Sequence, residues 1–138
     1  MRILIVGPQA DQWKTEYKEK AIQEIYRILS LNYIDGIIYI CGECPYGGID
    51  IWAKEVTIKL GIKIESYPPA TKDWRGYSQR NKLMAKICNI CYCIVPWNPL
   101  VKCHYHYPYF LQHPQNGGCW TRKYANKLGK ETHLVVIR

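Results

Sequence analysis

Short apolar runs recur along the chain and alternate with segments in which apolar residues have helical spacing. A short apolar, β-branched run bounded by turn residues is typical of a strand that is buried on both faces of a sheet. Such runs occupy residues 2–6, 37–40, 91–95 and 133–137. Residues 62–67 instead alternate apolar and polar side chains, which predicts an exposed or edge strand. The pattern therefore predicts five strands.

Four helices are predicted between these strands. The first has apolar residues at i, i+3, i+4 and i+7, namely Ile22, Ile25, Tyr26 and Leu29. Asp11 is predicted to cap this helix, which would run to about residue 30. The other three cover about residues 49–60, 78–87 and 121–128.

Two of these helices have a predicted core face. In the second helix the inward residues would be Ile49, Trp52, Ala53, Val56 and Leu60, with Gly61 as the C-cap. In the third they would be Leu83, Met84 and Ile87. Strands that alternate with helices and are themselves buried indicate an α/β fold with a doubly wound, mainly parallel sheet, because right-handed crossovers exclude most other topologies.

The segment between the fourth strand and the last helix is unusually long. It contains four prolines and no clear period from Pro96 to Gly118. A structureless connection of this length in a small domain is either a functional lid or a mobile segment. No other stretch suggests a domain boundary, so we expect one domain, residues 1–138, with an insertion at about 98–117.

Charge is distributed unevenly over the chain. Residues 1–73 carry nine Lys or Arg against ten Asp or Glu, whereas residues 74–138 carry ten against one. A positive field on one half of a sequence indicates an anionic partner, such as a nucleotide, a nucleic acid or an acidic protein, although a generally basic surface without a specific partner would give the same composition. No signal peptide or membrane span is evident, and we expect a soluble cytoplasmic protein.

A glycine-rich turn joins the second predicted strand to the following helix. It contains Gly42, Gly47 and Gly48 and resembles neither the Walker A nor the G-x-G-x-x-G motif. Glycines allow positive φ and close backbone approach, and the unpaired N–H groups at the start of a helix attract anions. The turn is either a phosphate cradle or a plain tight turn.

Nearly the whole chain resembles the YspA-type branch of the SLOG superfamily, Rossmann-like proteins related to the LOG phosphoribohydrolases. The matching pieces are the strand that ends at Gly7, the glycine loop with Asp50 and Ala53 behind it, the Gly-Ile-x-Ile strand leading to prolines and Asp73-Trp74, the pair Arg80-Asn81 with Met84, and the helix that begins at Gly117-Gly118. The catalytic signature Pro-Gly-Gly-x-Gly-Thr-x-x-Glu of the LOG enzymes is missing. The sequence Cys-Gly-Glu-Cys-Pro-Tyr in the glycine loop and a Cys/His-rich stretch at 101–115 also depart from the family.

This resemblance implies strand order 3-2-1-4-5, a nucleotide-type ligand and a homodimer. Ligands of such sheets bind where the strand order reverses, at the carboxyl ends of the strands. The loops 7–13 and 42–50 and the loop after Val95 would meet there. The predicted ligand-binding residues are Gly7, Gly42, Gly47, Gly48, Asp50, Trp74, Arg80, Asn81, Trp97, Gly117 and Gly118.

Each candidate also has a purely structural interpretation. Asp50 could hold a ribose hydroxyl or cap its helix, and Arg80 and Asn81 could bind phosphate and base or lie at a solvated helix start. Aromatic residues near strand ends could stack on a base or pack in the core; these are Trp13, Trp74, Tyr77 and Trp97.

Seven cysteines are many for 138 residues. Reduced thiols are the default inside cells, although the composition, rich in Ile, Tyr and Lys, would also suit a thermophile, where disulfides occur. The spacing Cys41-x-x-Cys44 and Cys88-x-x-Cys91 fits zinc, but parallel strands would place the two pairs at opposite edges of the sheet. Cys41, Cys91 and Cys93 are therefore expected to be buried in the core.

A better metal candidate lies in the long segment, on the same side as the ligand loops. It consists of Cys103, His104, His106, His113 and Cys119, with Cys44 able to join. A structural zinc ion would offset the entropy of ordering a long, proline-rich segment.

Binding of a nucleotide or nucleotide-derived ligand at the glycine loop, for sensing or sequestration, is the leading functional hypothesis. One alternative is hydrolysis of a nucleotide N-glycosidic bond, with Glu43 or Asp50 orienting the water. The other is a basic nucleic-acid-binding protein whose Cys/His insertion is stabilised by zinc.

Overall fold

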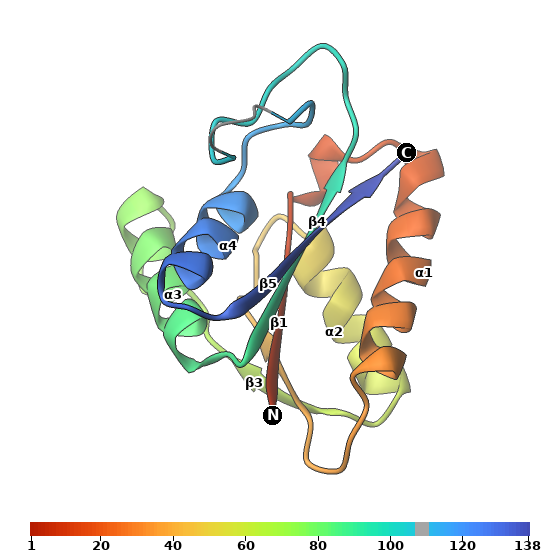
Figure 1. Cartoon of the computed structure of the whole chain (residues 1–138), viewed down its shortest axis with the longest axis vertical. Helices are drawn as coiled ribbons and strands as arrows, with labels where there is room; N and C mark the ends of the chain where they lie inside the picture. Colours follow the sequence, from red (N-terminus) through yellow and green to blue (C-terminus); the bar gives the residue numbers. More distant parts are fainter. Residues whose placement is uncertain (107–110) are drawn as a thin grey trace.

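The computed structural model describes residues 1–106 and 111–138, and their core is one five-stranded sheet (Figure 1). All strands are parallel, in the order β3-β2-β1-β4-β5. Their bounds are Arg2–Val6 (β1), Ile38–Cys41 (β2), Lys63–Ser66 (β3), Ile90–Pro96 (β4) and Glu131–Ile137 (β5). The predicted fold class and strand order are confirmed.

Helices cover both faces of the sheet. They are α1 (Thr15–Leu31), α2 (Ile49–Lys59), α3 (Trp74–Ile87) and α4 (Gly117–Lys127), with a short 3-10 helix at Ala10–Gln12. In Figure 1, α1 and α2 lie against one face and α3 and α4 against the other. No helix in the described part of the chain is both long and apolar enough to cross a membrane.

Alternate side chains of β1 build two separate core clusters. Ile3 and Ile5 pack with α1 and α2, whereas Leu4 and Val6 pack with α3 and α4. All four side chains are buried, because successive residues of a strand point to opposite faces. The apolar run that predicted β1 is therefore explained by helices on both sides of the central strand.

The predicted start of the first helix is wrong. Asp11 belongs to the 3-10 helix, and α1 begins at Thr15 after Lys14. The reason is Trp13, whose ring is buried against Trp52 at a centroid distance of 5.7 Å and whose Nε1 donates to Pro8 O at 3.2 Å. This anchor pulls the chain onto the core before the helix can start.

Helices α3 and α4 each begin about four residues earlier than apolar periodicity predicts, and α4 begins at Gly117, the start that the resemblance implies. Asp73 caps α3 by accepting a hydrogen bond from the Gly76 N–H at 2.9 Å. Asn116 caps α4 in the same way, accepting from the Cys119 N–H at 3.1 Å. Such caps satisfy N–H groups that the helix leaves unpaired, and both residues are N-cap types that apolar periodicity alone does not detect.

Two leucines that the periodicity predicts in the core lie at the surface. Leu83 is 45% exposed and Leu60 is 38% exposed. The inward side of α3 is formed by Asn81, Met84 and Ala85, so that Leu83 faces outward, and Leu60 lies after the last turn of α2. The edge position predicted for the third strand is confirmed, since β3 pairs only with β2.

The segment between β4 and α4 projects from the carboxyl end of the sheet (Figure 1). An isolated antiparallel bridge joins Cys103 and Leu111, with the Cys103 N–H donating to Leu111 O at 2.8 Å. Residues 107–110 of the predicted insertion lie outside the described residues. The connections after β1, β2 and β4 all begin at this edge of the sheet, and the strand order reverses between β1 and β4.

Candidate functional site

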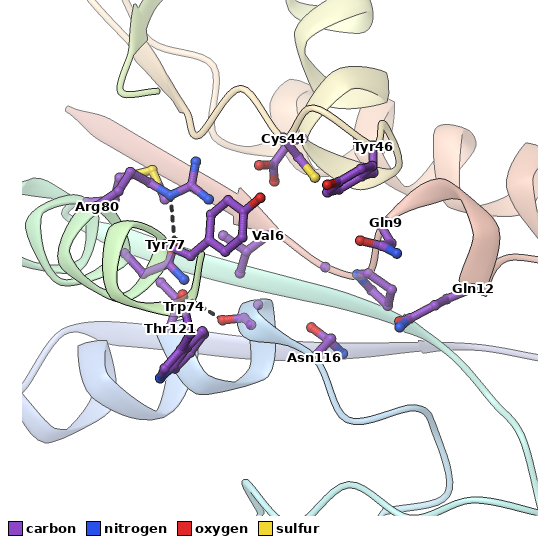
Figure 2. Close-up of a pocket in the computed structure, with 17 residues that line it drawn as sticks. Val6, Gln9, Gln12, Cys44, Tyr46, Trp74, Tyr77, Arg80, Asn116 and Thr121 are labelled. Carbon is purple, nitrogen blue, oxygen red and sulfur yellow. Dashed lines mark hydrogen bonds between the residues drawn. The ribbon is translucent and has the colours of Figure 1, made fainter. Parts of the chain in front are cut away.

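A cavity of about 230 Å³ lies at this reversal point (Figure 2). Its walls come from the turn after β1, the β2–α2 loop, the first half of α3 and the start of α4. A single water molecule occupies about 30 Å³ of liquid volume, so the cavity can hold a small organic group. The three predicted segments thus meet, although the segment after β4 contributes through the start of α4, and α3 adds a fourth wall.

Asp50 is a buried carboxylate in the cavity wall. It lies in the first turn of α2, whose N-cap is Gly48, and it is 9% exposed. Burial raises the pKa of Asp50 to about 6, against the opposing effect of the Arg80 charge. A carboxyl group held in this way costs stability, and costly perturbed groups in clefts are typical of functional sites.

The cost of burying Asp50 can be measured directly. Its native pKa is above the unfolded value, so the native state binds the extra proton and wild-type stability falls as pH rises from about 4 to 6. Between pH 4.5 and 7.5 we expect the wild type to lose about 2 kcal/mol relative to Asp50→Asn. Urea unfolding of both proteins across this range measures the difference. A stability difference that does not vary with pH would contradict the assignment.

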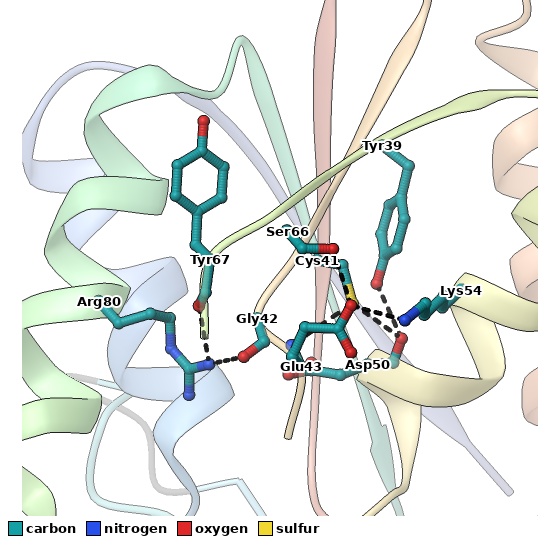
Figure 3. A network of polar contacts seen from close by, with 9 residues as sticks. All are labelled: Tyr39, Cys41, Gly42, Glu43, Asp50, Lys54, Ser66, Tyr67 and Arg80. Atoms are coloured by element: carbon teal, nitrogen blue, oxygen red, sulfur yellow. Dashed lines mark hydrogen bonds and ion pairs between the residues drawn. The ribbon is translucent and has the colours of Figure 1, made fainter. Parts of the chain in front are cut away.

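Arg80 lies next to Asp50 and is held by backbone and side-chain oxygens. Its Nη1 donates to the carbonyl oxygens of Gly42 and Tyr67, and its Nε donates to Asn81 Oδ1 at 2.8 Å (Figure 3). A Cβ at Gly42 would lie 2.6 Å from Arg80 Nη1 and 2.9 Å from Asp50 Oδ2. Only glycine at position 42 leaves room for both the Arg80 guanidinium and the Asp50 carboxylate beside this loop.

Two buried polar atoms of cavity residues have no hydrogen-bond partner among the described residues. They are Tyr77 OH and Gln12 Oε1. Tyr77 OH lies near the hydroxyl of Tyr46, and burial, followed by that neighbour, raises its pKa. A buried polar group without a partner costs about 1–3 kcal/mol, so both atoms favour a bound water or ligand in the cavity.

The start of α4 closes the cavity opposite the β2–α2 loop. A Cβ on Gly118 would lie 2.6 Å from Gly7 N and 2.8 Å from Gly7 Cα, and a Cβ on Gly7 would lie 2.3 Å from Ile94 O. Only glycines allow this close contact between the helix and the strand ends. A Cβ on the neighbouring Gly117 would have as its nearest contact Asn81 Nδ2, at 3.5 Å.

This difference between neighbouring glycines gives a matched pair of variants. Gly118→Ala should lower the free energy of unfolding by about 1–3 kcal/mol, because backbone atoms of Gly7 would have to move. Gly117→Ala should change it by less than about 0.5 kcal/mol. Thermal or urea unfolding of the two variants measures both values, and equal effects would show that the contact with Gly7 is not tight.

Of the predicted ligand residues, seven line the cavity: Gly7, Asp50, Trp74, Arg80, Asn81, Gly117 and Gly118. Gly42 supports Arg80 from outside the cavity, as described above. Gly47 and Gly48 shape the loop at φ of 74° and 86°, and a Cβ on Gly48 would lie 2.3 Å from Pro8 O. Trp97 is outside the cavity, where its N–H donates to Ile137 O at 2.8 Å.

Glu43 does not line the cavity, and its carboxylate faces Lys54 and Ser66 (Figure 3). Its carboxylate accepts hydrogen bonds from Lys54 Nζ and Ser66 Oγ, both at 2.7 Å. Burial alone would raise the pKa of Glu43, but these two donors hold it below its usual value. The structure therefore does not bring the two predicted catalytic acids, Glu43 and Asp50, to the same cavity.

Several cavity residues were not identified from the sequence as site residues. These are Gln9, Gln12, Cys44, Tyr46, Asn116 and Thr121. Only Asn116 carried a readable signal, as an N-cap residue type directly before Gly117-Gly118. Gln9, Gln12, Cys44 and Tyr46 belong to the loops 7–13 and 42–50 that were predicted to meet here, but no spacing rule selects these individual residues. Thr121 lies within α4, one turn after Gly117.

A second group of chemically reactive side chains lies beside α4. Cys103, His106, His113 and Cys119 are all buried, and one ligand atom from each lies within 4.8 Å of the others. They are four of the five predicted metal ligands. His104 is not in this group and its backbone N–H donates to Gln115 Oε1 at 3.2 Å, while Cys44 lies in the cavity wall.

Two distances within this group are close to those of a tetrahedral metal site. Zinc–nitrogen bonds of about 2.0–2.1 Å and zinc–sulfur bonds of about 2.3 Å imply N···N edges of about 3.3 Å and N···S edges of about 3.6 Å. His106 Nε2 and His113 Nε2 are 3.1 Å apart, and His113 Nε2 is 3.9 Å from Cys119 Sγ. The group could hold a metal ion after small side-chain adjustments.

Neighbouring groups orient both histidines. His113 Nδ1 lies 3.0 Å from Pro114 O, which makes Nδ1 the protonated nitrogen and leaves Nε2 unprotonated inside the group. Burial lowers the pKa of His113, which favours its neutral form. Arg122 Nη2 donates to His106 Nδ1 at 3.1 Å, so a neutral His106 carries its proton on Nε2. Binding of a metal ion through His106 Nε2 would therefore require this proton to move to Nδ1 and Arg122 to turn away. The orientation of His113 is the one that metal-binding histidines commonly adopt.

All seven cysteines are described, and each is a free thiol. Cys41, Cys91 and Cys93 are fully buried in the core, as expected. Cys93 Sγ lies 3.7 Å from Cys119 Sγ, so a third cysteine borders the group.

Comparisons of this chain with protein-family models and with curated proteins find no match. The resemblance to the SLOG superfamily therefore stays a prediction from the sequence.

Proposed function

We propose that the cavity binds a nucleotide or nucleotide-derived small molecule, for sensing or sequestration. The observation that carries this proposal is the buried Asp50 carboxyl group beside the half-buried Arg80 guanidinium in the cavity wall, at the reversal point of a parallel sheet. Open α/β sheets bind ligands at this point. The unpaired Tyr77 hydroxyl and Gln12 carbonyl add hydrogen-bonding capacity that the described residues do not use themselves.

The polar groups of the cavity form one subsite for an anionic part of a ligand and another for its neutral parts. Arg80 and the start of α4 at Gly117-Gly118 are suited to a phosphate, because a guanidinium and helix N–H groups both favour negative charge. Asp50 is suited to the hydroxyls of a ribose. The exposed rings of Trp74 and Tyr46, which are 51% and 58% accessible, offer flat surfaces for a base at the mouth.

A thermal-shift panel tests this proposal. It should contain the four ribonucleoside 5′-monophosphates, ADP-ribose and inorganic phosphate. A nucleotide present at about 100 times its Kd stabilises the folded state by about 2.7 kcal/mol, so at least one member should raise Tm by several degrees. No shift with any of them would overturn the proposal.

Binding titrations at several salt concentrations separate a ligand bound in the cavity from a nucleic acid. Several phosphate contacts to DNA or RNA give log K a steep negative slope in log salt, whereas one bound nucleotide does not. Binding of a duplex with such a slope, unchanged in Arg80→Ala, would favour the nucleic-acid hypothesis over the cavity.

Hydrolysis is a second candidate, favoured by Asp50. A carboxyl group with a pKa of about 6 can accept or donate a proton near neutral pH, which is the range useful for general acid–base catalysis. Water would add to the anomeric carbon and the base would leave with a proton. Chromatographic detection of free base from a nucleoside monophosphate, lost in Asp50→Asn, tests this candidate, and no release of base excludes it for that substrate.

We further propose that the buried Cys2His2 group holds a structural zinc ion. Two thiolates and two imidazoles in a closed, buried, tetrahedral arrangement are typical of structural zinc sites. Elemental analysis of protein purified without chelator should give about one zinc per chain. A content well below stoichiometry, even after zinc is added during folding, would contradict this assignment.

Membership of the SLOG superfamily, a homodimeric state and a cytoplasmic location stay proposals that rest on the sequence alone. Light scattering in solution tests the proposed dimer. A measured mass close to 16.2 kDa, the mass of one chain, would contradict it.

A further inference from the structure

The Cys2His2 group and the cavity share one turn of helix. Cys119, the fourth member of the group, is the third residue of α4, and the first two residues, Gly117 and Gly118, line the cavity. Thr121 lines it one turn later, and its hydroxyl donates to Gly117 O at 2.7 Å. A movement of Cys119 therefore moves the cavity wall.

Asn116 joins the two sites through its side chain. Its Oδ1 accepts a hydrogen bond from the Cys119 N–H at 3.1 Å, and its Nδ2 lies 3.4 Å from Cys119 Sγ. The same Nδ2 donates to Pro114 O at 3.0 Å, the carbonyl that also contacts His113 Nδ1. Asn116 thus contacts one residue of the group, Cys119, directly and a second, His113, through one carbonyl, while it lines the cavity itself.

We propose that a metal ion in the Cys2His2 group sets the position of the first turn of α4, and that it thereby raises the affinity of the cavity for a phosphate-bearing ligand. This inference rests on the proposed function and on the zinc assignment. It adds that the two sites are thermodynamically coupled and that Asn116 is the positioning residue between them.

The physical basis of the coupling is conformational entropy. Between β4 and α4, the described backbone is tied by few hydrogen bonds, among them Asn98 N–H to Gln112 O and Cys103 N–H to Leu111 O, each at 2.8 Å. A metal ion that bridges Cys103 and Cys119 closes this loop and restricts Asn116 and the start of α4. A ligand that binds an already ordered turn then loses less entropy on binding.

Calorimetric titration of AMP into zinc-loaded and metal-free protein tests the coupling. We expect the zinc-loaded protein to bind about 5- to 150-fold more tightly, which is the usual range of coupling between two sites. By reciprocity, saturating AMP should raise the affinity of the protein for zinc by the same factor, which competition with a chelator measures. Equal AMP affinities in the two forms would overturn the inference while leaving the proposed function intact.

Asn116→Ser is the selective variant. Serine keeps an N-cap acceptor for Cys119 N–H, but it loses the Nδ2 contacts with Cys119 Sγ and Pro114 O. The variant should still hold about one zinc, and its ratio of zinc-loaded to metal-free affinities should fall towards one. An unchanged ratio would show that Asn116 does not couple the two sites.

Amide hydrogen exchange provides a readout that does not depend on the choice of nucleotide. The N–H groups of Cys119 and Trp120, which donate to Asn116 Oδ1 and Asn116 O, should exchange at least about tenfold faster without zinc. Amides of β1 and β4 should stay protected and show that the sheet is intact. Equal exchange of α4 in both forms would overturn the inference. If AMP binds neither form but α4 responds to zinc, the proposed function fails and the ordering effect of the metal stands.

Discussion

Removal of zinc should lower the free energy of unfolding by about 4 kcal/mol or more, measured where free zinc exceeds its Kd a thousandfold in the loaded sample. The four members of the Cys2His2 group join the segment after β4 to α4, and an ion that binds the folded but not the unfolded chain stabilises the fold by mass action. Urea unfolding with zinc and with a chelator measures the difference.

Two cysteine variants make this test specific. Cys103→Ala should lose stoichiometric zinc and become insensitive to the chelator, because it removes one of the four members. Cys91→Ala alters an equally buried thiol outside the group and should keep both the zinc and the chelator sensitivity. Loss of zinc in both variants, or in neither, would contradict the assignment of these ligands.

Arg80→Ala should weaken binding of the nucleotide identified by the thermal-shift panel by about 30-fold to several thousandfold. Truncating a charge that pairs with a partially desolvated anion typically costs about 2–5 kcal/mol. Arg80 also holds the carbonyl groups of Gly42 and Tyr67, so the shape of the loop changes with it. Isothermal titration measures the affinity.

The control for this variant is on the same helix. Lys82→Ala removes an exposed positive charge two residues away, outside the cavity, and should change the affinity by less than about threefold. Arg80→Lys keeps the charge but not the planar fork and should fall between the two. Equal losses in Arg80→Ala and Lys82→Ala would indicate a general charge effect instead of a binding site.

The sheet could be predicted from the sequence because its strands are short apolar runs. Ile3 to Val6 are apolar at every position since helices cover both faces, and β3 alternates since it lies at an edge. Helix starts were less predictable, because Trp13 and the caps Asp73 and Asn116 act through single contacts that periodicity does not contain.

The two sites differ in how far the sequence could describe them. Gly7 and Gly118 were identified through the resemblance, and the structure shows the close backbone contacts that require glycine there. The direction of the Glu43 side chain could not be predicted. Glu43 has a positive φ of 52°, and its carboxylate is turned towards Lys54 and Ser66. Nor could spacing choose His106 over His104 in a segment without regular structure.

The central claim is that a nucleotide binds in the cavity between Arg80, Asp50 and the start of α4. Its most direct test is a ¹H–¹⁵N NMR titration of the 138-residue protein with the nucleotide that gives the largest thermal shift. Saturable shifts should concentrate on the amides of Gly7, Asp50, Asn81, Gly117 and Gly118. Saturable shifts confined to residues outside the cavity, or none at millimolar nucleotide, would contradict the account.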